Sequence, residues 1–350
     1  MAEPELTDRT RGEVRARLSP DLLTAVATAW DLGEINVAAP TEDIGGSYNL
    51  NLRLQTDRGE VVVRVYRPWV TPDRLAAVQG LRHALRREAI PTIVPLSRSN
   101  GATALEWAGR LVEVEPWVSS ESGADSWQRY VTAGAELGRL HAALRRIRVA
   151  DPFPPAPVSS VIAPSVFADW IARARRAIAA APLAPGAVDA LATCDEAERL
   201  RTIITAEPRP GHIVQLTHGD FAHDNVRFFG TSPVAILDFD FIDTRDRITD
   251  LAYTTYWMFE HLQWDIPAAE RDWWRAGDLV RGYAEASGIP LTAEELVWLP
   301  LAMATIPTTW VAETWLMGDV LEAIGLVARQ METVAWLINH RHDLAQMWAP

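Results

Sequence analysis

The chain has 350 residues, of which 48% are apolar and 23% charged, a composition typical of a folded globular protein and not of a disordered one. Its net charge of −13 argues against nucleic acid as the main partner, because a phosphate backbone requires a basic surface. The charge is compatible with a small cationic substrate. The chain contains no lysine, so a phosphate-binding role that lysine commonly fills must fall to one of the 33 arginines.

The sequence gives no sign of export or of membrane insertion. It begins with acidic and polar residues, and its most apolar stretch, 299–317, is interrupted by two prolines and a glutamate. The single cysteine, Cys194, cannot form an intramolecular disulfide, and we interpret it as unreactive. We therefore expect a cytoplasmic protein without a membrane or nucleic-acid partner. The sequence leaves its oligomeric state open.

The first third of the chain predicts a small domain rich in strands. Apolar residues recur at helical spacing behind the capping pair Ser19-Pro20, and the pattern changes to alternation after residue 35. The expected elements are a helix over 18–32, strands over 48–55 and 60–66, a helix over 72–88, and strands over 104–107 and 111–114.

Beyond a polar connector at 119–125, the pattern becomes predominantly helical. The expected elements are helices over 127–145, 166–180 and 195–205, a proline-rich loop over 151–164, a strand, loop and hairpin over 213–243, and helices from residue 250 onward. The length fits about two domains. We therefore predict an α+β protein with two lobes, residues 1–118 (with the leading helix) and residues 119–350, and a nucleotide in the cleft between them.

Three oxygen-bearing side chains follow one another closely in the second lobe. His218-Gly219-Asp220 ends a short apolar strand, Asn225 comes five residues after Asp220, and Asp238 ends the apolar run 234–237. Phosphoryl transfer needs such a set, with one carboxylate to orient and deprotonate a hydroxyl and two oxygen ligands to hold Mg²⁺ against a nucleotide's phosphates. Singly, each residue is explained by turn formation or strand capping, but the combination favours a site with Asp220 as base and Asn225 and Asp238 as metal ligands.

These motifs resemble the catalytic and metal-binding segments of the aminoglycoside phosphotransferase and choline kinase family, whose fold is the protein-kinase-like one. The resemblance runs from about residue 35 to at least 260 and rests on His218-Gly219-Asp220, Asn225, Leu237-Asp238-Phe239, Asp250-Leu251-Ala252 and Leu137-Gly138-Arg139-Leu140-His141. It implies ATP and Mg²⁺ as cofactors and transfer of the γ-phosphoryl to a hydroxyl. It also implies supporting roles for His218, for Asp250, which would brace the loop, and for Asp240, with direct metal ligation of Asp240 as the alternative.

The nucleotide-binding half is a looser match to this family. Arg64 occupies the position of the family's phosphate-binding lysine, and we expect it to replace that lysine, although a solvent-facing arginine is the alternative. The family's partner glutamate on the following helix is not evident, and Gln79 and Glu88 are the nearest candidates. We expect the remaining contacts to come from a glycine loop over the phosphates and a connector strand beside the base, that is, from Gly45, Gly46, Ser47, Glu115 and Trp117.

The region after Asp238 combines acidic and aromatic residues, which suits an amine- or sugar-bearing acceptor through charge pairing and cation–π contact. The candidate acceptor residues are Asp243, Trp257, Glu260, His261 and Trp264. The alternative is that the tryptophans belong to the core and the acids face solvent. The acceptor itself stays open among aminoglycosides or other antibiotics, amino alcohols, homoserine and sugars.

Two other functions are weighed against a small-molecule kinase. The missing lysine and helix glutamate favour a binding or regulatory protein that has lost catalysis on the same fold, whereas the retained Asp220, Asn225 and Asp238 argue for an active enzyme. A protein kinase is disfavoured, because nothing in the sequence resembles the activation segment of such enzymes.

Overall fold

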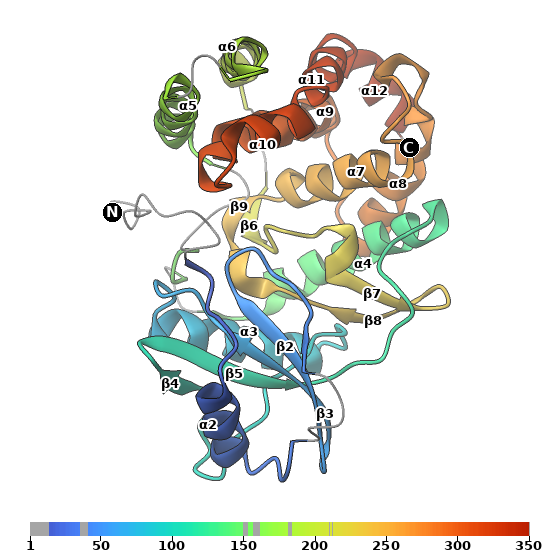
Figure 1. Cartoon of the computed structure of the whole chain (residues 1–350). Coiled ribbons are helices and arrows are strands. Elements are labelled where there is room, and N and C mark those ends of the chain that lie inside the picture. The colour runs from blue at the N-terminus through green and yellow to red at the C-terminus, as the bar shows by residue number, and fades with distance from the viewer. Residues whose placement is uncertain are drawn as a thin grey trace. The chain divides into compact units, whose positions relative to one another are not determined.

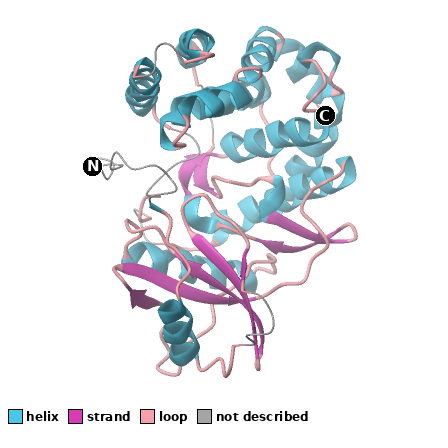
Figure 2. Cartoon of the chain, viewed as in Figure 1, coloured by secondary structure: helices cyan, strands magenta, loops and turns pink. Residues whose placement is uncertain are grey.

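The computed structural model describes residues 14–35, 41–149, 153–156, 162–180, 184–209, 211 and 213–349. The chain divides into two compact units. The sheet unit comprises Met1–Ser119 and Val149–Pro157, and the helical unit comprises Ser120–Arg148 and Val158–Pro350. Figure 1 labels their elements, and Figure 2 separates helices from strands by colour.

The sheet unit is built on five antiparallel strands in the order β1-β2-β3-β5-β4 (Figure 1). The strands are β1 (Glu42–Asp43), β2 (Leu50–Thr56), β3 (Gly59–Val65), β4 (Leu105–Trp107) and β5 (Arg110–Pro116), and the helices are α2 (Pro20–Trp30) and α3 (Pro72–Arg87). In this register Arg64 on β3 lies opposite Asn51 on β2 and opposite Glu113 on β5. Residues distant in sequence are thereby brought into one row across the sheet.

The two faces of this sheet have different chemistry, because successive side chains of a strand point to opposite faces. One face carries leucines and valines, among them Leu52, Val63 and Val114, and packs against α2 through Leu22 and Val26. The other face carries the polar residues of the row and is contacted by α3. The hydrophobic core of the unit therefore lies beneath α2, and the polar face is left for α3 and for ligands.

The helical unit contains nine of the described α-helices and five short 3₁₀ helices. The α-helices are α4 (Trp127–Arg146), α5 (Pro164–Ala179), α6 (Ala187–Ala206), α7 (Ile248–Leu262), α8 (Ala276–Ser287), α9 (Ala293–Glu313), α10 (Val320–Val327), α11 (Gln330–Asn339) and α12 (Arg341–Trp348). The 3₁₀ helices are η1 (His223–Asn225), η2 (Phe239–Phe241), η3 (Ala268–Glu270), η4 (Trp273–Arg275) and η5 (Thr314–Leu316). No helix within the described ranges is long and apolar enough to cross a membrane.

Two helix contacts organise this unit. α9 packs against α5, α6, α7, α11 and α12, and most of its residues are buried, which fits its largely apolar sequence. α4 packs closely on α8, because Gly134 and Gly138 leave room for it. A Cβ atom at Gly138 would lie 2.4 Å from the carbonyl oxygen of Tyr283, so only glycine permits this approach.

Two short antiparallel pairs hold the loops that matter for function. β6 (Val214–Thr217) pairs with β9 (Asp243–Asp246), and β7 (Val226–Phe229) pairs with β8 (Ser232–Ile236). Thr217 lies opposite Asp243, and Val226 lies opposite Ile236. The loops 218–225 and 237–242 therefore begin and end at the same two paired positions, which places them side by side.

Most of the elements predicted from the sequence are confirmed within two or three residues, and two differ. The helix expected over 195–205 begins at Ala187, because its first turns leave Val188 and Leu191 exposed and show no apolar stripe. Strand β9 was not predicted, because its sequence is polar and does not alternate. The acidic residues 1–5 and half of the proline-rich stretch 151–164 lie outside the described residues.

A fully buried ion pair joins the start of α7 to the start of α9. Arg247 donates to Glu295 from Nε (2.8 Å) and from Nη2 (2.6 Å), and it also donates to the carbonyl oxygens of Ile289 and Pro290. Both side chains have no solvent exposure. Glu295 also completes a capping box with Thr292, so one carboxylate starts α9 and neutralises a buried guanidinium.

We predict that Glu295→Gln lowers the free energy of unfolding by about 3–5 kcal/mol, because it leaves a buried guanidinium without its counter-ion. Denaturant titration measures the change. The control is Glu196→Gln, which breaks the surface pair of Glu196 with Arg199 and should cost less than about 1 kcal/mol. Equal losses in the two variants would contradict the role given to the Arg247–Glu295 pair.

Candidate active site

The carboxylate of Asp250 holds the loop 218–225 in place from the first turn of α7. It accepts hydrogen bonds from the backbone N–H of His218 (2.6 Å) and of Gly219 (2.8 Å), and from Nε2 of His141 on α4 (3.0 Å). Burial disfavours ionisation of this carboxyl, but the His141 hydrogen bond and the nearby imidazoles outweigh burial and lower the pKa of Asp250. The imidazole of His141 is itself fixed, because its Nδ1 bonds to the hydroxyl of Tyr283 at 2.9 Å.

His218 links the two loops through its ring nitrogens. Nε2 donates to the carbonyl oxygen of Leu237 (2.8 Å), and Nδ1 accepts from the backbone N–H of Asp220 (3.3 Å). Burial lowers the pKa of this imidazole, so the neutral ring with hydrogen on Nε2 satisfies both bonds. Gly219 has a φ of 83°, and a Cβ there would lie 2.4 Å from the carbonyl oxygen of Phe241. The turn before Asp220 therefore requires glycine.

Asp220 and Asn225 face each other within the loop 218–225. The amide nitrogen of Asn225 donates both to the carbonyl oxygen of Asp220 (2.8 Å) and to its carboxylate (2.9 Å). Burial raises the pKa of Asp220 to about 8, and the charge of Asp238 adds to the rise, while hydrogen bonds from Tyr253 and Asn225 oppose it. Asp220 is thus a carboxyl whose pKa lies near neutrality, as a general base requires.

The loops present an oxygen donor set that fits a magnesium ion. Asn225 turns its amide nitrogen to Asp220, and its side-chain oxygen accepts no hydrogen bond from any described residue. Asp238 follows β8 in a left-handed conformation with φ of 57°. No cluster of three His, Cys, Asp or Glu side chains suited to a metal occurs in the described part of the chain. Mg²⁺ commonly takes one or two protein oxygens and completes its shell with water and phosphate oxygens, so two such ligands suffice.

The polar face of the sheet unit carries the residues expected to bind nucleotide. Nε of Arg64 donates to the side-chain oxygen of Asn51 at 3.0 Å, and its guanidinium lies 5.8 Å from the ring centre of Tyr66. Gly45 and Gly46 lie between β1 and β2 with φ of 94° and 117°, a backbone conformation that favours glycine. The N–H of Gly45 donates to Asp43, whereas the N–H groups of Gly46 and Ser47 bond to no described residue.

α3 meets this face with a cation rather than an acid. Arg82 pairs with Glu113 (2.8 Å) and with Glu115, and the amide of Gln79 donates to Glu113 at 2.7 Å. Glu88, the other candidate partner for Arg64, is exposed at the carboxyl end of α3. Compared with the family pattern the charges are reversed, since the acids lie on β5 and the helix carries the arginine.

The connector strand leaves less room for base recognition than we expected. The side chain of Glu115 belongs to the buried cluster with Arg82, and the ring of Trp117 lies under the guanidinium of Arg53 at 4.1 Å. The N–H of Trp117 donates to the carbonyl oxygen of Glu60 at 3.0 Å. Adenine recognition by Glu115 or Trp117 therefore stays a prediction, and the N–H of Trp117 is already occupied.

A model of the phosphotransferase enzyme family matches residues 41–289, more than half of the chain. The chain belongs to this family. The matched range includes both loops, Arg64 and Asp250, and the family resemblance seen in the sequence motifs is confirmed.

Relatives of known activity and structure agree with this assignment. A homoserine kinase of Acidiphilium cryptum (strain JF-5) is 27% identical over 289 residues, covering 82% of this chain and 83% of the relative. A microcompartment-associated aminopropanol kinase shares the fold with a TM-score of 0.63 and 14% identity, covering 91% of this chain and 98% of that one. An amicoumacin kinase in complex with AMP-PNP, Ca²⁺ and Ami matches with a TM-score of 0.62 and 13% identity, covering 90% and 93%.

The comparisons confirm two of the broad predictions. The protein has the two-lobed, protein-kinase-like α+β fold, with a small antiparallel sheet in one part and mainly helices in the other. It is a phosphotransferase that acts on a hydroxyl group of a small molecule, as the motifs indicated.

Two of the five candidate acceptor residues lie beside the loop 218–225. The ring of His223 in this loop lies 5.2 Å from that of Trp257 and 4.4 Å from that of His261, both on α7. Trp257 also contacts Tyr253, which bonds to Asp220, and Trp310 of α9 at 5.2 Å. The prediction overlooked Tyr253 and Trp310, although Tyr253, Trp257 and His261 have the i, i+4 spacing of one helix face.

The other three candidates have partners elsewhere in the helical unit. Glu260 forms a buried ion pair with Arg271 at 2.7 Å and also accepts from Gln330, so its carboxylate already has two partners and its acceptor role stays a prediction. Trp264 is 54% exposed and lies under the guanidinium of Arg329. Asp243 lies on β9 and accepts from the N–H of Thr244, and Asp240 is buried in η2.

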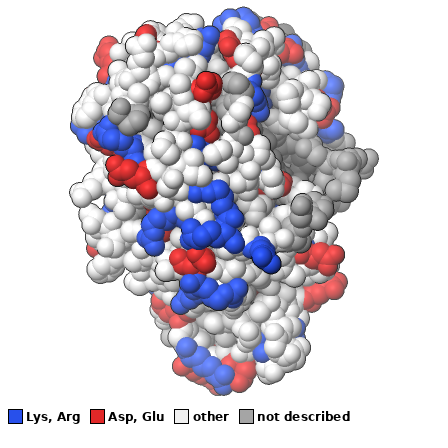
Figure 3. All heavy atoms as spheres, turned by 180° about the vertical axis from the view of Figure 1, so that it is seen from behind, with Lys and Arg blue, Asp and Glu red and all other residues white. Residues whose placement is uncertain are grey.

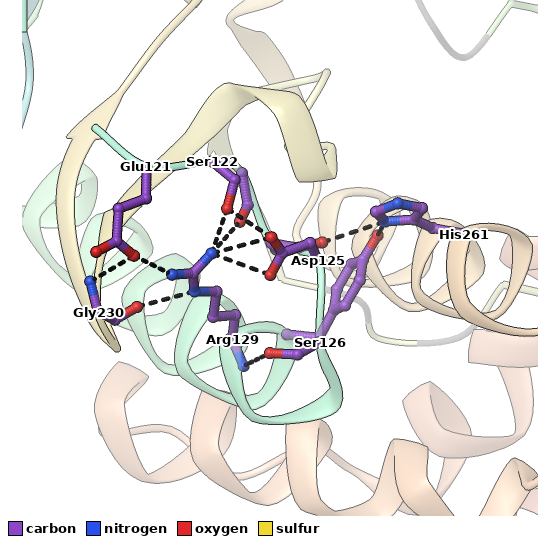
Figure 4. Close-up of polar contacts among 10 residues, drawn as sticks. Glu121, Ser122, Asp125, Ser126, Arg129, Gly230 and His261 are labelled. Carbon is purple, nitrogen blue, oxygen red and sulfur yellow. Dashed lines mark hydrogen bonds and ion pairs between the residues drawn. The ribbon is translucent and has the colours of Figure 1, made fainter. Parts of the chain in front are cut away.

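The connector is joined to the turn between β7 and β8 by a polar network that the sequence did not reveal (Figure 4). Arg129 on α4 pairs with Glu121 (2.7 Å) and Asp125 (3.0 Å) and donates to the carbonyl oxygen of Gly230 at 2.8 Å. The N–H of Ala124 donates to the carbonyl oxygen of His223, and a Cβ at Gly123 would lie 2.2 Å from that same oxygen. The connector is therefore packed directly on the backbone of the loop 218–225.

Charged side chains are distributed unevenly over the surface. On the face shown in Figure 3, arginines gather in one group near the middle with acidic side chains among them, although the chain as a whole carries a net charge of −13.

The buried acids of the sheet unit predict a pH-dependent stability. Burial raises the pKa of Glu115 to about 7, and the neighbouring Glu113 adds to the rise, while Arg82 opposes it. The folded protein therefore keeps a proton on Glu115 that the unfolded chain loses above the ordinary pKa of 4.5. The free energy of unfolding consequently falls as the pH rises from 4.5 to 7.

We predict that Glu115→Gln reduces this decline, as measured by denaturant titration at several pH values. Glu106→Gln, at an exposed position of β4, serves as control; an unchanged slope in Glu115→Gln would contradict the assignment.

Proposed function

We propose that this protein transfers the γ-phosphoryl of ATP to the hydroxyl of a small amino alcohol, with Asp220 as the base. The observation that carries this proposal is the pairing of Asp220 with Asn225, which gives the base a fixed hydrogen-bond partner and turns the amide oxygen of Asn225 away from it. A single loop thereby supplies both a proton acceptor and a metal ligand.

Asp220 would orient the acceptor hydroxyl and take its proton as the phosphoryl group is transferred. Its raised pKa supports the proton-accepting role, and the hydrogen bond from Asn225 limits rotation of its carboxylate. Much of the rate enhancement in such reactions comes from positioning and from electrostatic stabilisation. The buried contacts of Asp250 and His218 supply the positioning, because they fix the backbone on both sides of Gly219.

Asn225 and Asp238 would hold Mg²⁺, and Arg64 would contact the phosphates together with the free N–H groups of Gly46 and Ser47. The bound ion would neutralise charge on the phosphate oxygens during transfer. The donor chemistry supports this assignment, because both ligands offer hard oxygen atoms and lie on loops that run side by side. The nucleotide role would belong to residues 1–118, and the catalytic and acceptor roles to residues 119–350.

We favour an amino alcohol as acceptor over a sugar or a macrolide. A relative with 27% identity is a homoserine kinase, and one similar structure is an aminopropanol kinase; both named substrates combine a hydroxyl with an amine. The aromatic rings of Trp257, Trp310 and Tyr253 lie together near Asp220, and aromatic faces attract ammonium groups. An amine of the acceptor would therefore bind against Trp257, with its hydroxyl at Asp220.

The proposal is tested with ATP, Mg²⁺ and a panel of acceptors consisting of homoserine, aminopropanol, choline, an aminoglycoside and a sugar. We expect product with the amino alcohols and a loss of about 10²- to 10⁴-fold in turnover for Asp220→Asn, the range typical of a general base. The matched control is Asp224→Asn, in the same loop but 74% exposed, which should retain wild-type turnover. Transfer to none of the acceptors, or full activity of Asp220→Asn, would refute the proposal.

A further inference from the structure

Asn51 on β2 connects two parts of the polar face that the proposed function assigns to phosphate binding. Its side-chain nitrogen donates to the carbonyl oxygen of Gly45 at 2.9 Å, and its side-chain oxygen accepts from Nε of Arg64 at 3.0 Å. The two strands are directly paired at this point, since Asn51 lies opposite Arg64. One planar amide thus bonds to the glycine loop on one side and to the guanidinium on the other.

The backbone of the glycine loop lies close to the side-chain amide of Asn51. A Cβ at Gly46 would lie 2.7 Å from the side-chain nitrogen of Asn51 and 2.6 Å from the carbonyl oxygen of Asn49, so the loop closes directly over Asn51. Arg15 holds the same loop from another direction, donating to the carbonyl oxygen of Gly46 at 2.9 Å and pairing with Asp43. The loop and Arg64 therefore keep a fixed spacing only if the amide of Asn51 stays in place.

No acid of α3 can position Arg64. The only acidic residue within α3 is Asp73, in the exposed first turn, and the middle of the helix offers Gln79 and Arg82 instead. Both of these contact Glu113, the cross-strand neighbour of Arg64 on β5. Within the sheet, Arg64 has the amide of Asn51 on one neighbouring strand and the carboxylate of Glu113 on the other.

We propose that Asn51 is a positioning residue for nucleotide binding, which sets the guanidinium of Arg64 at a fixed distance from the glycine loop in place of a helix glutamate. This inference depends on the phosphate-binding role proposed for Arg64. A hydrogen bond to a charged group that fixes a long side chain is among the stronger side-chain contacts, and it reduces the rotamer freedom that Arg64 would lose on binding phosphate.

The test compares Asn51→Ala, Arg64→Ala and the double variant in two measurements, the dissociation constant of Mg·ATP by calorimetry and the steady-state constants for both substrates. We expect Asn51→Ala to weaken nucleotide binding about tenfold or more and to raise the KM for ATP alike, with the KM for the acceptor unchanged. Because Asn51 acts through Arg64, the double variant should bind Mg·ATP about as weakly as Arg64→Ala alone. Gln55→Ala is the matched control, since Gln55 lies on the same face of β2 and its side chain donates to Glu60 and not to the glycine loop or Arg64; it should bind like wild type.

The possible outcomes separate this inference from the proposed function. If Arg64→Ala weakens nucleotide binding and Asn51→Ala does not, the positioning role of Asn51 is refuted while the proposed function stands. If Asn51→Ala and Arg64→Ala weaken binding by independent, multiplying factors, Asn51 does not act through Arg64 and the inference also fails. If Arg64→Ala binds Mg·ATP like wild type, the phosphate role of Arg64 falls together with this inference, whereas the role of Asp220 is tested separately by turnover.

Discussion

The site depends above all on one buried carboxylate. Asp250 accepts hydrogen bonds from the N–H groups of His218 and Gly219 and from the imidazole of His141, so the loop 218–225 and α4 are both joined to α7 at its two oxygens. An unpaired carboxylate in this position would be costly, and so would backbone N–H groups without acceptors. These bonds therefore fix the backbone immediately before Asp220.

The chemistry follows from what this carboxylate fixes. Asp250 holds the backbone N–H of His218, and the ring of His218 donates to the carbonyl oxygen of Leu237. This second bond joins the loop 218–225 to the loop 237–242. The paired strand ends, Thr217 with Asp243 and Val226 with Ile236, bring the same loops together from outside. Asp220, Asn225 and Asp238 are thus positioned by backbone contacts and by a neutral imidazole.

The sequence predicted the arrangement of this loop well, because the residues involved are close together in the chain. The five-residue spacing from Asp220 to Asn225 and the position of Asp238 at a strand end restrict where these side chains can lie. This restriction is local and does not depend on the rest of the fold. Trp257 and His261, predicted as acceptor residues from the aromatic and acidic composition of their region, lie beside this loop in the structure. The ion pair of Glu260 with Arg271, which lies in a loop eleven residues later, gave no such local signal in the sequence.

The nucleotide face was harder to predict, because its contacts depend on strand register. Asn51, Arg64 and Glu113 are separated by 13 and 49 positions and become neighbours only when β2, β3 and β5 pair in their observed register. The reversal of charge between α3 and β5 has no local signal, since a glutamate in a strand and an arginine in a helix are individually unremarkable. The absence of a helix glutamate suggested a weakened site from sequence alone; the structure instead shows a different set of partners for Arg64.

The account makes Asp250 responsible for the placement of Asp220, and a double-mutant cycle on turnover tests this most directly. Asp250→Asn and Asp220→Asn are measured singly and together under saturating ATP, Mg²⁺ and acceptor. If Asp250 acts by placing the base, each single variant loses most of the activity and the double variant is about as slow as Asp220→Asn alone, the non-additive pattern of residues that work as a unit. Losses that multiply in the double variant would show that Asp250 contributes independently of Asp220 and would contradict the account.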